Sequence, residues 1–251
     1  MLISAAVCPH PPLLVPEVAG AAAAELDGLR AACDEAVRRL DPPVVDLRCE
    51  SPQARGDQDL RVVIVGGAEE TRRWPAESVA DLRPYGLDYT VDAWGEGEPL
   101  PLSLTIGLWL LYRQCPGNQI LGGKLDYRSV AFDAAPEECA ELGRELAASG
   151  DRVALLVMGD GSACRSEKAP GYLDDRAGPH DAGVARALKD ADAAALAALD
   201  PQVSRELQAA GRAAWQVLAG AAGDGRFRAE LLADEAPYGV GYLVASWIRT
   251  G

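Results

Sequence analysis

The chain has 251 residues, of which 49% are hydrophobic and 25% charged, a mixture that excludes collagen, coiled-coil and wholly disordered proteins. Its 38 acidic and 24 basic side chains give a formal net charge of -14, which repels a phosphate backbone and an anionic membrane surface. We therefore expect neither nucleic acid nor a membrane as a partner. The length suits a single domain over residues 1–251.

The amino-terminal part of the chain predicts a strand, a helix and a second strand. Residues 2–7 form a short apolar run that stops at the Cys-Pro-His-Pro-Pro segment of residues 8–12, which predicts a buried strand with His10 at its end. From Pro16 to Leu40 apolar residues recur every three or four positions, which predicts one helix. Residues 60–65 are rich in β-branched side chains and end at Gly66-Gly67, which predicts a buried strand whose glycines let the backbone approach a ligand or another chain.

The middle of the chain continues this alternation. We expect a helix over residues 103–115, a strand over 129–133 and a helix that begins at Pro136. Residues 152–158 are a continuous apolar run, typical of a buried strand, and lead into the polar turn Gly159-Asp160-Gly161-Ser162. The pattern predicts an α/β fold with a central, mostly parallel or mixed sheet flanked by helices. Sites in such folds lie at the carboxyl edge of the sheet.

The carboxyl-terminal part predicts a loop, helices and a final strand. The residues between Ser162 and His180 lack periodicity, which predicts a long loop. Helices are expected over 180–188 and 191–199, followed by a longer one from Pro201 through Val217. Residues 238–247 combine glycines with β-branched and aromatic residues, which predicts a last strand that returns to the core.

The cysteines and the amino terminus bear on the cellular compartment. The six cysteines are scattered without a C-x-x-C pair, so we expect reduced thiols and neither a zinc ribbon nor a thioredoxin motif. The first residues lack the basic region and long apolar stretch of a signal peptide, and no apolar run reaches the roughly 18 residues that span a bilayer. We therefore expect a cytoplasmic protein.

The chain contains only two histidines, His10 and His180, and this limits metal and acid-base mechanisms. The sequence has no G-x-S-x-G elbow and no G-x-x-x-x-G-K-[ST] loop, and no G-x-G-x-x-G follows the first strand. Hydrolase, nucleotide and dinucleotide functions therefore lack their sequence signatures.

Three separated segments nevertheless form an ordered set. They are residues 8–12 with Pro16-Glu17, residues 159–162 followed by Ala-Pro-Gly-Tyr at 169–172, and Glu-Ala-Pro-Tyr-Gly-Val-Gly-Tyr at 235–242. In order and approximate spacing, over nearly the whole chain, the set resembles the catalytic subunit of class III extradiol ring-cleavage dioxygenases, a superfamily that also contains the Memo-like proteins. Asp181 and the helices after it also fit that pattern.

The resemblance implies an α/β fold with a ferrous ion at the strand ends, held by two histidines and one glutamate. Such a triad leaves coordination positions open for a catechol and dioxygen. An outer-shell histidine is the acid-base residue in family members. By position, the resemblance makes His10 the first iron ligand and Glu235 the carboxylate ligand.

The chain departs from the family pattern at three positions of the site. Family members carry the second histidine ligand in a Pro-His pair, where this chain has Gly66-Gly67. Ala163 stands where the outer-shell histidine is usual, and residues 101–104 (Pro-Leu-Ser-Leu) replace the Glu-His-Ser of Memo-like members. The two missing histidines remove a metal ligand and the acid-base group.

Several residues remain candidates for a site, each with a simpler structural alternative. The catalytic candidates are His10, Asp160 and Ser162, and the substrate-binding candidates are Tyr172 and Tyr238, with Arg176 and Tyr242 as further lining residues. The simpler alternatives are a hydrogen-bonded histidine at a strand end, an Asx turn and a helix cap for the first three, rim packing for the tyrosines, and a surface acid for Glu235. His180 is expected to pack or to bond at a helix start. Cys164 beside Arg165 has the setting of a reactive thiolate unless it is buried.

Two functional hypotheses follow. In the first, the protein is a divergent member of the superfamily that has lost its iron triad, uses no cofactor, and is a binding or structural protein or catalyses another reaction. In the second, it is an active Fe(II)-dependent oxygenase for a catechol-type substrate, with a metal site of His10 and Glu235 supplemented by Asp160 or a cysteine. The first is preferred because carboxylates match a borderline metal less well than imidazole does. A small aromatic ligand is the expected partner, and association into a homo-oligomer stays open.

Overall fold

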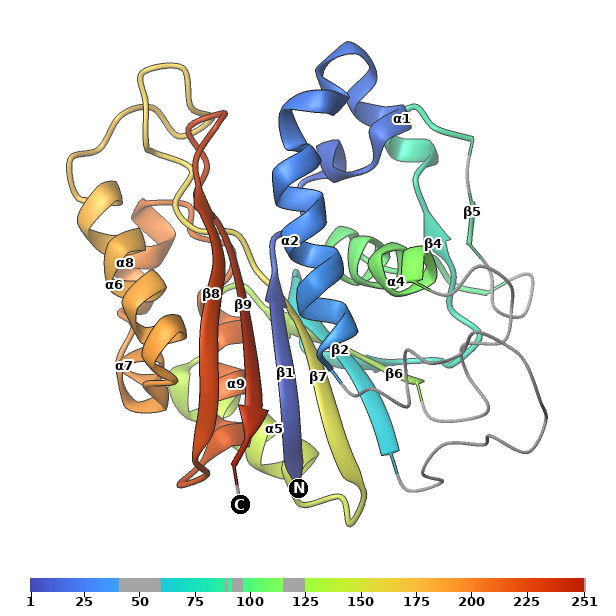
Figure 1. The fold of residues 1–251 in the computed structure, drawn as a ribbon, viewed down its shortest axis with the longest axis vertical. Coiled ribbons are helices and arrows are strands. Elements are labelled where there is room, and N and C mark those ends of the chain that lie inside the picture. The colour runs from blue at the N-terminus through green and yellow to red at the C-terminus, as the bar shows by residue number, and fades with distance from the viewer. Residues whose placement is uncertain (41–59, 89, 92–96, 115–124, 251) are drawn as a thin grey trace.

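The computed structural model describes residues 1–40, 60–88, 90–91, 97–114 and 125–250, and in them the chain folds around a seven-stranded mixed sheet (Figure 1). The strand order is β3-β6-β2-β7-β1-β9-β8. The strands are β1 (Leu2–Cys8), β2 (Leu60–Ala68), β3 (Arg72–Trp74), β6 (Leu125–Ala131), β7 (Arg152–Met158), β8 (Phe227–Glu235) and β9 (Tyr242–Arg249). The four strands β6, β2, β7 and β1 are parallel, and β3, β9 and β8 pair antiparallel with their neighbours. A separate two-stranded sheet joins β4 (Ala80–Asp81) to β5 (Thr90–Val91).

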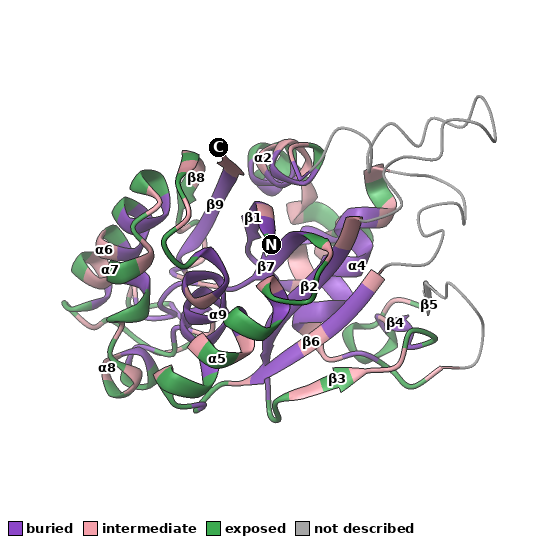
Figure 2. Cartoon of the chain, turned by 90° about the horizontal axis from the view of Figure 1, so that it is seen from below, coloured by how far each residue is buried: buried purple, intermediate pink, exposed green. Residues whose placement is uncertain are grey.

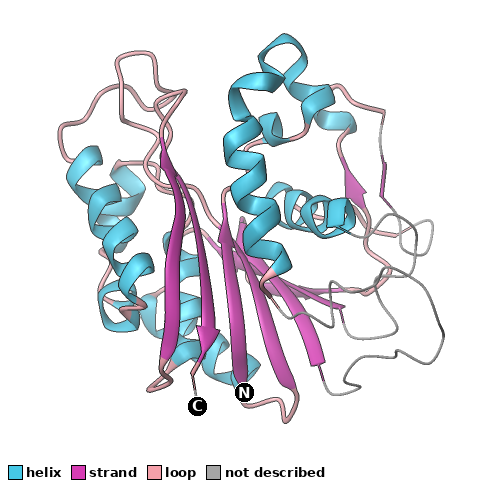
Figure 3. Ribbon diagram, viewed as in Figure 1, coloured by secondary structure: helices cyan, strands magenta, loops and turns pink. Residues whose placement is uncertain are grey.

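Helices cover both faces of the large sheet (Figure 3). They are α1 (Pro16–Ala19), α2 (Asp27–Arg38), α4 (Leu102–Gln114), α5 (Pro136–Ala147), α6 (Ala177–Asp190), α7 (Ala193–Ala197), α8 (Pro201–Glu206) and α9 (Arg212–Ala222), with short 3-10 helices η1 (Pro12–Leu14), η2 (Gly20–Leu26) and η3 (Arg83–Tyr85). This arrangement confirms the expected α/β fold with a mixed sheet flanked by helices.

The core consists of two apolar layers, because successive side chains of a strand point to opposite faces. Ile64 and Leu156 belong to the layer that packs against α2 and α4. Val65 and Val157 belong to the layer that packs against α5, α6 and α9. The central strands are accordingly buried along their length (Figure 2), and each such side chain stabilises the fold by about 1.5 to 3 kcal/mol.

The carboxyl ends of three parallel strands meet at one edge of the sheet. Cys8 of β1 and Gly66 of β2 both lie opposite Met158 of β7. The segments that follow these residues therefore leave the sheet at the same level. His10 follows Cys8 by two residues, and Asp160 follows its partner Met158 by two residues.

The buried strands and the most apolar helices were predicted correctly. The runs at 2–7, 60–65 and 152–158 are β1, β2 and β7, and the helices expected at 103–115 and from Pro136 are α4 and α5. Residue 115 lies outside the described part of the chain. The helices expected at 180–188 and 191–199 are α6 and α7, and the segment between β7 and α6 is the predicted loop.

Two expected long helices are each broken into shorter ones. The single helix predicted from Pro16 to Leu40 is α1, η2 and α2, because Gly20 ends α1 with a positive φ of 56°. The helix predicted from Pro201 through Val217 is α8 and α9, separated by a turn in which Gln208 has a φ of 51°. The N–H of Gly211 in this turn donates to the carbonyl oxygen of Asp160 (2.8 Å). The break therefore docks the turn onto the carboxyl edge of β7.

The strand predictions were wrong at the margins of the sheet. The strand expected at 129–133 occupies Leu125–Ala131, and the last strand begins at Tyr242 rather than at residue 238. Its partner β8 was not predicted, because its polar side chains alternate with apolar ones along an edge strand. The edge strand β3, with two arginines in three residues, was missed for the same reason.

The described residues also bear on the membrane and cysteine predictions. No described helix is both long enough and apolar enough to cross a bilayer. Cys8, Cys33, Cys139 and Cys164 are buried free thiols, whereas Cys49 and Cys115 lie outside the described residues.

Candidate functional site

His10 and Asp160 come together at the carboxyl edge of the parallel strands. The backbone N–H of His10 donates to Asp160 Oδ1 (2.8 Å), and the imidazole Nδ1 lies 3.7 Å from the same oxygen. The His10 side chain is 7% exposed and that of Asp160 is 15% exposed. The parallel register of β1 and β7 positions this pair, since it aligns the two strand ends.

The imidazole of His10 has unused hydrogen-bonding capacity. Its Nδ1 is buried and has no hydrogen-bond partner among the described residues, because 3.7 Å is too long for a hydrogen bond to Asp160. A buried polar atom without a partner costs about 1 to 3 kcal/mol. The simpler alternative for His10, a ring satisfied by hydrogen bonds at a strand end, therefore does not hold for this nitrogen.

Tyr242 adds a phenol to the same edge. It is the first residue of β9 and only 3% exposed. Burial, together with the nearby charge of Asp160, raises the pKa of the Tyr242 hydroxyl far above its ordinary value. The phenol therefore stays protonated and is a neutral neighbour of the carboxylate.

Glu235 ends β8 opposite Tyr242 and is exposed. Its Oε1 lies beside α2, where a Cβ added to Gly28 would be 4.0 Å away. The resemblance implies this residue as the carboxylate ligand of an iron ion. Among the described residues, however, no group of three or more His, Cys, Asp or Glu side chains is arranged to hold a metal ion.

The space of the missing second histidine is filled by the chain itself. A Cβ on Gly66 would lie 2.5 Å from Ser103 Oγ of α4, and one on Gly67 would lie 2.5 Å from the ring of Phe132. The Ser103 hydroxyl also donates to the carbonyl oxygen of Gly67 (2.8 Å). The glycine pair permits a close approach, but α4 and the residue after β6, both of the same chain, make it, where the sequence suggested a ligand or another chain.

The residues present therefore do not fit the iron triad that the resemblance implies. His10 is the one histidine that faces Asp160, because His180 bonds to Asp181 and Ser204, and glycine and alanine stand at the positions of the other two histidines. The arrangement suits hydrogen bonding to a polar ligand better than coordination of a metal ion.

Ser162 belongs to a different cluster, centred on Asp181. Its N–H donates to Asp181 Oδ1 (2.8 Å) and its hydroxyl donates to Oδ2 (2.7 Å). Arg165 lies 3.1 Å from Oδ2, and His180 Nδ1 lies 3.2 Å from Oδ1. We call Ser162, Arg165, His180 and Asp181 the Asp181 cluster. The Ser162 hydroxyl is bound to this carboxylate and fully buried, and it is not part of the His10 and Asp160 pair.

The Asp181 cluster ties three segments together. Asp181 is 1% exposed, and its burial acts to raise the pKa of the carboxyl, but the hydrogen bonds from His180, Ser162 and Arg165 outweigh burial and hold that pKa below its ordinary value. A Cβ on Gly241 would lie 2.4 Å from Asp181 Oδ2. The Gly161 N–H also donates to the Gly241 carbonyl oxygen (2.7 Å). The carboxylate thus fastens the turn after β7 to α6, and the backbone bond from Gly161 to Gly241 joins that turn to the one before β9.

The other lining candidates have no described hydrogen bond or ion pair with His10 or Asp160. Tyr172 is 74% exposed and has a positive φ of 61°. The Tyr238 hydroxyl donates to Glu25 Oε2 (3.0 Å). Arg176 binds Asp174 (2.7 Å) and Glu206 (2.7 Å) on the surface. These partners, Glu25, Asp174 and Glu206, are surface acids outside the His10 and Asp160 pair.

Cys164 does not have the setting of a reactive thiolate. Its Sγ is buried against the carbonyl oxygens of Leu207 (3.4 Å) and Gly171 (3.5 Å), and burial raises the pKa of the thiol. Arg165, which would have favoured the thiolate, binds Asp181 instead. The condition under which the sequence favoured a reactive thiolate, an unburied Cys164, is therefore not met, because burial opposes the charged form.

Comparisons with known proteins bear on the fold. No protein-family model matches the chain, and no curated protein matches it either. Among solved structures, the crystal structure of an uncharacterized protein, JW3007, from Escherichia coli K12 matches with a TM-score of 0.52 at 13% sequence identity. The match covers 98% of this chain and 99% of that one. At this identity the likeness shows that the two chains share a fold over their whole length, and it carries no statement about activity.

Proposed function

We propose that this protein is a divergent relative of the class III extradiol dioxygenases that binds a small phenolic molecule at the carboxyl edge of its parallel strands, without an iron triad. The observation that carries the proposal is the buried imidazole of His10, whose Nδ1 lacks a partner and faces the Asp160 carboxylate at 3.7 Å. An unsatisfied polar group at this edge of an α/β sheet is where a ligand site is expected.

The chemistry of the pair suits a phenol. A phenolic hydroxyl both donates and accepts, so it can accept a hydrogen bond from the unpartnered Nδ1 of His10 and donate one to the Asp160 carboxylate oxygen 3.7 Å away. The protonated Tyr242 hydroxyl supplies a neutral neighbour near Asp160. Because the residues present do not fit the iron triad, the proposal is binding and assigns no ring-cleavage step to these side chains.

The test is a calorimetric titration of the purified protein with catechol and phenol, combined with iron analysis and oxygen-consumption measurements. His10→Phe keeps a planar ring but loses both nitrogens, and we expect it to weaken phenol binding by about tenfold or more. His180→Phe is the matched control, because it removes the other histidine of the chain, whose nitrogens contact Asp181 and Ser204 and neither His10 nor Asp160. It should leave the affinity unchanged at a temperature where both variants are folded.

Two results would overturn the proposal. One iron ion per chain together with oxygen consumption on catechol would establish the alternative, an active ring-cleavage dioxygenase with an altered metal site. Equal phenol affinity in the wild type and His10→Phe would show that the edge around His10 is not the binding site.

A further inference from the structure

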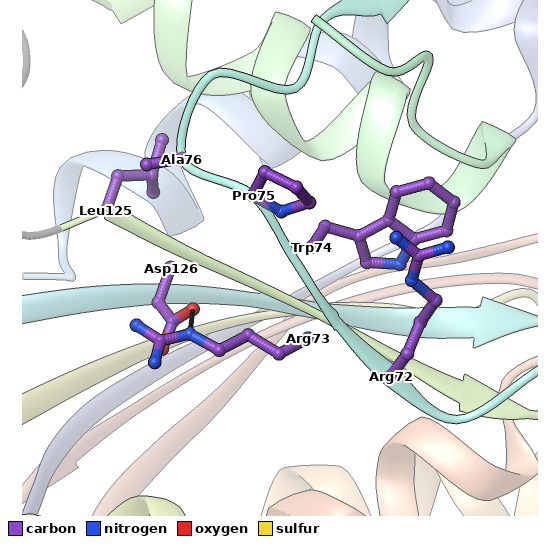
Figure 4. A pocket seen from close by; sticks show the side chains of 7 residues that line it. All are labelled: Arg72, Arg73, Trp74, Pro75, Ala76, Leu125 and Asp126. Carbon is purple, nitrogen blue, oxygen red and sulfur yellow. Dashed lines mark hydrogen bonds and ion pairs between the residues drawn. The ribbon is translucent and has the colours of Figure 1, made fainter.

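A pocket of about 340 Å³ lies at the opposite side of the sheet, where β3 ends and β6 begins (Figure 4). Its lining residues are Arg72, Arg73, Trp74, Pro75, Ala76, Leu125 and Asp126. The volume is at the lower end of the range of small-molecule sites. In the strand order, β2 and β7 separate β6 from β1, so this pocket is distinct from the His10 edge.

Three arginines surround one buried carboxylate beside this pocket. Asp126 is 4% exposed, and Arg73 Nε lies 3.0 Å from Oδ1, while Arg128 and Arg61 lie 3.2 and 3.9 Å from Oδ2. Arg73 of β3 lies opposite Arg128 of β6, so both side chains point to the face of the sheet that carries the Asp126 side chain. Arg61 is also 3.4 Å from Asp151. Three guanidinium groups therefore meet two carboxylates, which leaves an excess of positive charge.

Arg73 is the member of this group that is available to a ligand. Its side chain is 62% exposed, and its hydrogen bond to Asp126 uses Nε. Its two terminal nitrogens have no hydrogen-bond partner within the described ranges of the chain. The bond to a buried carboxylate fixes the orientation of the guanidinium before a ligand arrives, which lowers the entropy cost of binding.

The rest of the pocket is apolar or already neutralised. Arg72 lies over the Trp74 ring at 4.0 Å from its centroid and binds Glu98 at 2.8 Å, so its charge is compensated. The Trp74 indole N–H donates to Ser129 Oγ (2.9 Å), which fixes the ring (Figure 4 shows Arg72 over it). Pro75 and Leu125 add apolar surface beside Arg73.

We propose that this pocket binds a small organic carboxylate. The carboxylate lies on the two terminal nitrogens of Arg73 as a bidentate pair, and the apolar body of the ligand lies against Pro75 and Leu125. A planar guanidinium fork matches the two oxygens of a carboxylate, and such charge-assisted pairs are about twice as strong as neutral hydrogen bonds. The site is independent of the phenol site proposed around His10.

The probe is benzoate, with benzyl alcohol as its neutral counterpart. The readout is the NMR signal of the Trp74 indole N–H, identified by its loss in Trp74→Phe, because this signal reports on the pocket and not on the His10 edge. We expect benzoate to shift it saturably and benzyl alcohol to bind about tenfold or more weakly.

Two variants and one control distinguish the contribution of the Arg73 charge to binding from that of the open volume of the pocket. Arg73→Gln should weaken benzoate binding by about ten- to a hundredfold, the loss expected for a charge-assisted hydrogen bond. Ala76→Trp adds a ring at an exposed position and should abolish binding by filling the pocket. Arg83→Gln is the matched control, since the Arg83 side chain is also 62% exposed and bonded to an aspartate, Asp81, through Nε. It should change nothing.

The proposal is overturned if benzoate gives no saturable shift of the Trp74 signal, if benzoate and benzyl alcohol bind equally, or if Arg73→Gln binds benzoate as well as Arg83→Gln does. Urea unfolding of Arg73→Gln establishes that the variant is folded, since Arg61 and Arg128 still face Asp126 in it.

Discussion

The two histidines of this chain each lie beside an aspartate, and the two pairs differ in how completely their polar atoms are satisfied. His180 contacts Asp181 through Nδ1 (3.2 Å) and Ser204 through Nε2 (3.5 Å), and Asp181 also accepts hydrogen bonds from Ser162 and Arg165. His10 Nδ1 has no partner in the described structure. The described hydrogen bond to the Asp160 side chain comes from the His10 backbone.

This difference distinguishes a structural pair from a candidate functional one. The Asp181 cluster has its hydrogen-bonding capacity filled by the protein, and it joins the turn after β7, the start of α6 and the turn before β9. The His10 and Asp160 pair keeps capacity that the fold does not fill. Burial alone does not separate the two, because both histidine side chains are nearly buried, at 7% and 9% exposure.

The largest expected effect is on stability, from Asp181→Asn. The amide keeps the size of the side chain but removes the negative charge to which Arg165 and Ser162 donate hydrogen bonds. We therefore expect a loss of about 3 to 5 kcal/mol in the free energy of unfolding. Asp160→Asn should cost about 1 kcal/mol, because one backbone hydrogen bond is at stake there. Urea unfolding followed by circular dichroism measures both. An equal loss in the two variants would remove the contrast between the clusters.

The Asp181 carboxylate should make the free energy of unfolding depend on pH. The folded pKa of Asp181 is lowered, so its contribution is fully present above the unfolded value of about 3.9 and is lost as the pH falls through the folded pKa. We expect the difference in unfolding free energy between the wild type and Asp181→Asn to be constant near neutral pH. It should shrink below about pH 4. A difference that stays constant down to pH 2 would contradict the assignment.

The matched replacement of each histidine by phenylalanine tests the comparison directly. His180→Phe removes one partner from Asp181 and one from Ser204, and should cost about 2 kcal/mol in unfolding free energy. His10→Phe removes a buried nitrogen that had no partner, and should change that free energy by less than about 1 kcal/mol. Urea midpoints of the two variants, measured side by side, decide the matter. A greater loss in His10→Phe would mean that the ring of His10 is held by the fold after all.

The parts of the fold that the sequence predicts well are those where a single physical rule applies. Parallel strands buried on both faces are continuous apolar runs, so β1, β2 and β7 were found to within a few residues. The edge strands β3 and β8 carry charged residues that face solvent, and no such run marks them. The helix from Pro201 was overextended because its break depends on a hydrogen bond between Gly211 and Asp160, which is a tertiary contact.

The candidate site, like the fold, was only partly predictable from the sequence. The rule that parallel strands end at one edge brings His10 and Asp160 together, as expected from their positions after β1 and β7. The direction of the Ser162 side chain could not be predicted, because it is set by Asp181 and by the turn at Gly241, far along the chain. Pocket residues such as Arg73 were missed with the strand that carries them. The run Arg-Arg-Trp-Pro at residues 72–75 was their one signal in the sequence.

The smallest expected effect concerns Tyr172, whose φ of 61° is unfavourable for a residue with a side chain and whose ring is 74% exposed. Glycine adopts this conformation without strain, so Tyr172→Gly should raise the unfolding free energy by about 0.5 to 1 kcal/mol, less the entropy that glycine adds to the unfolded chain. Leu173→Gly is the control, because Leu173 is also exposed but has no positive φ, and it should lower that free energy by a similar amount. Urea unfolding measures both, and a phenol titration of Tyr172→Gly adds a second readout. If the Tyr172 side chain contacts the ligand, Tyr172→Gly binds phenol more weakly although the protein is more stable. If the phenol affinity is unchanged, Tyr172 does not contribute to binding at the His10 edge.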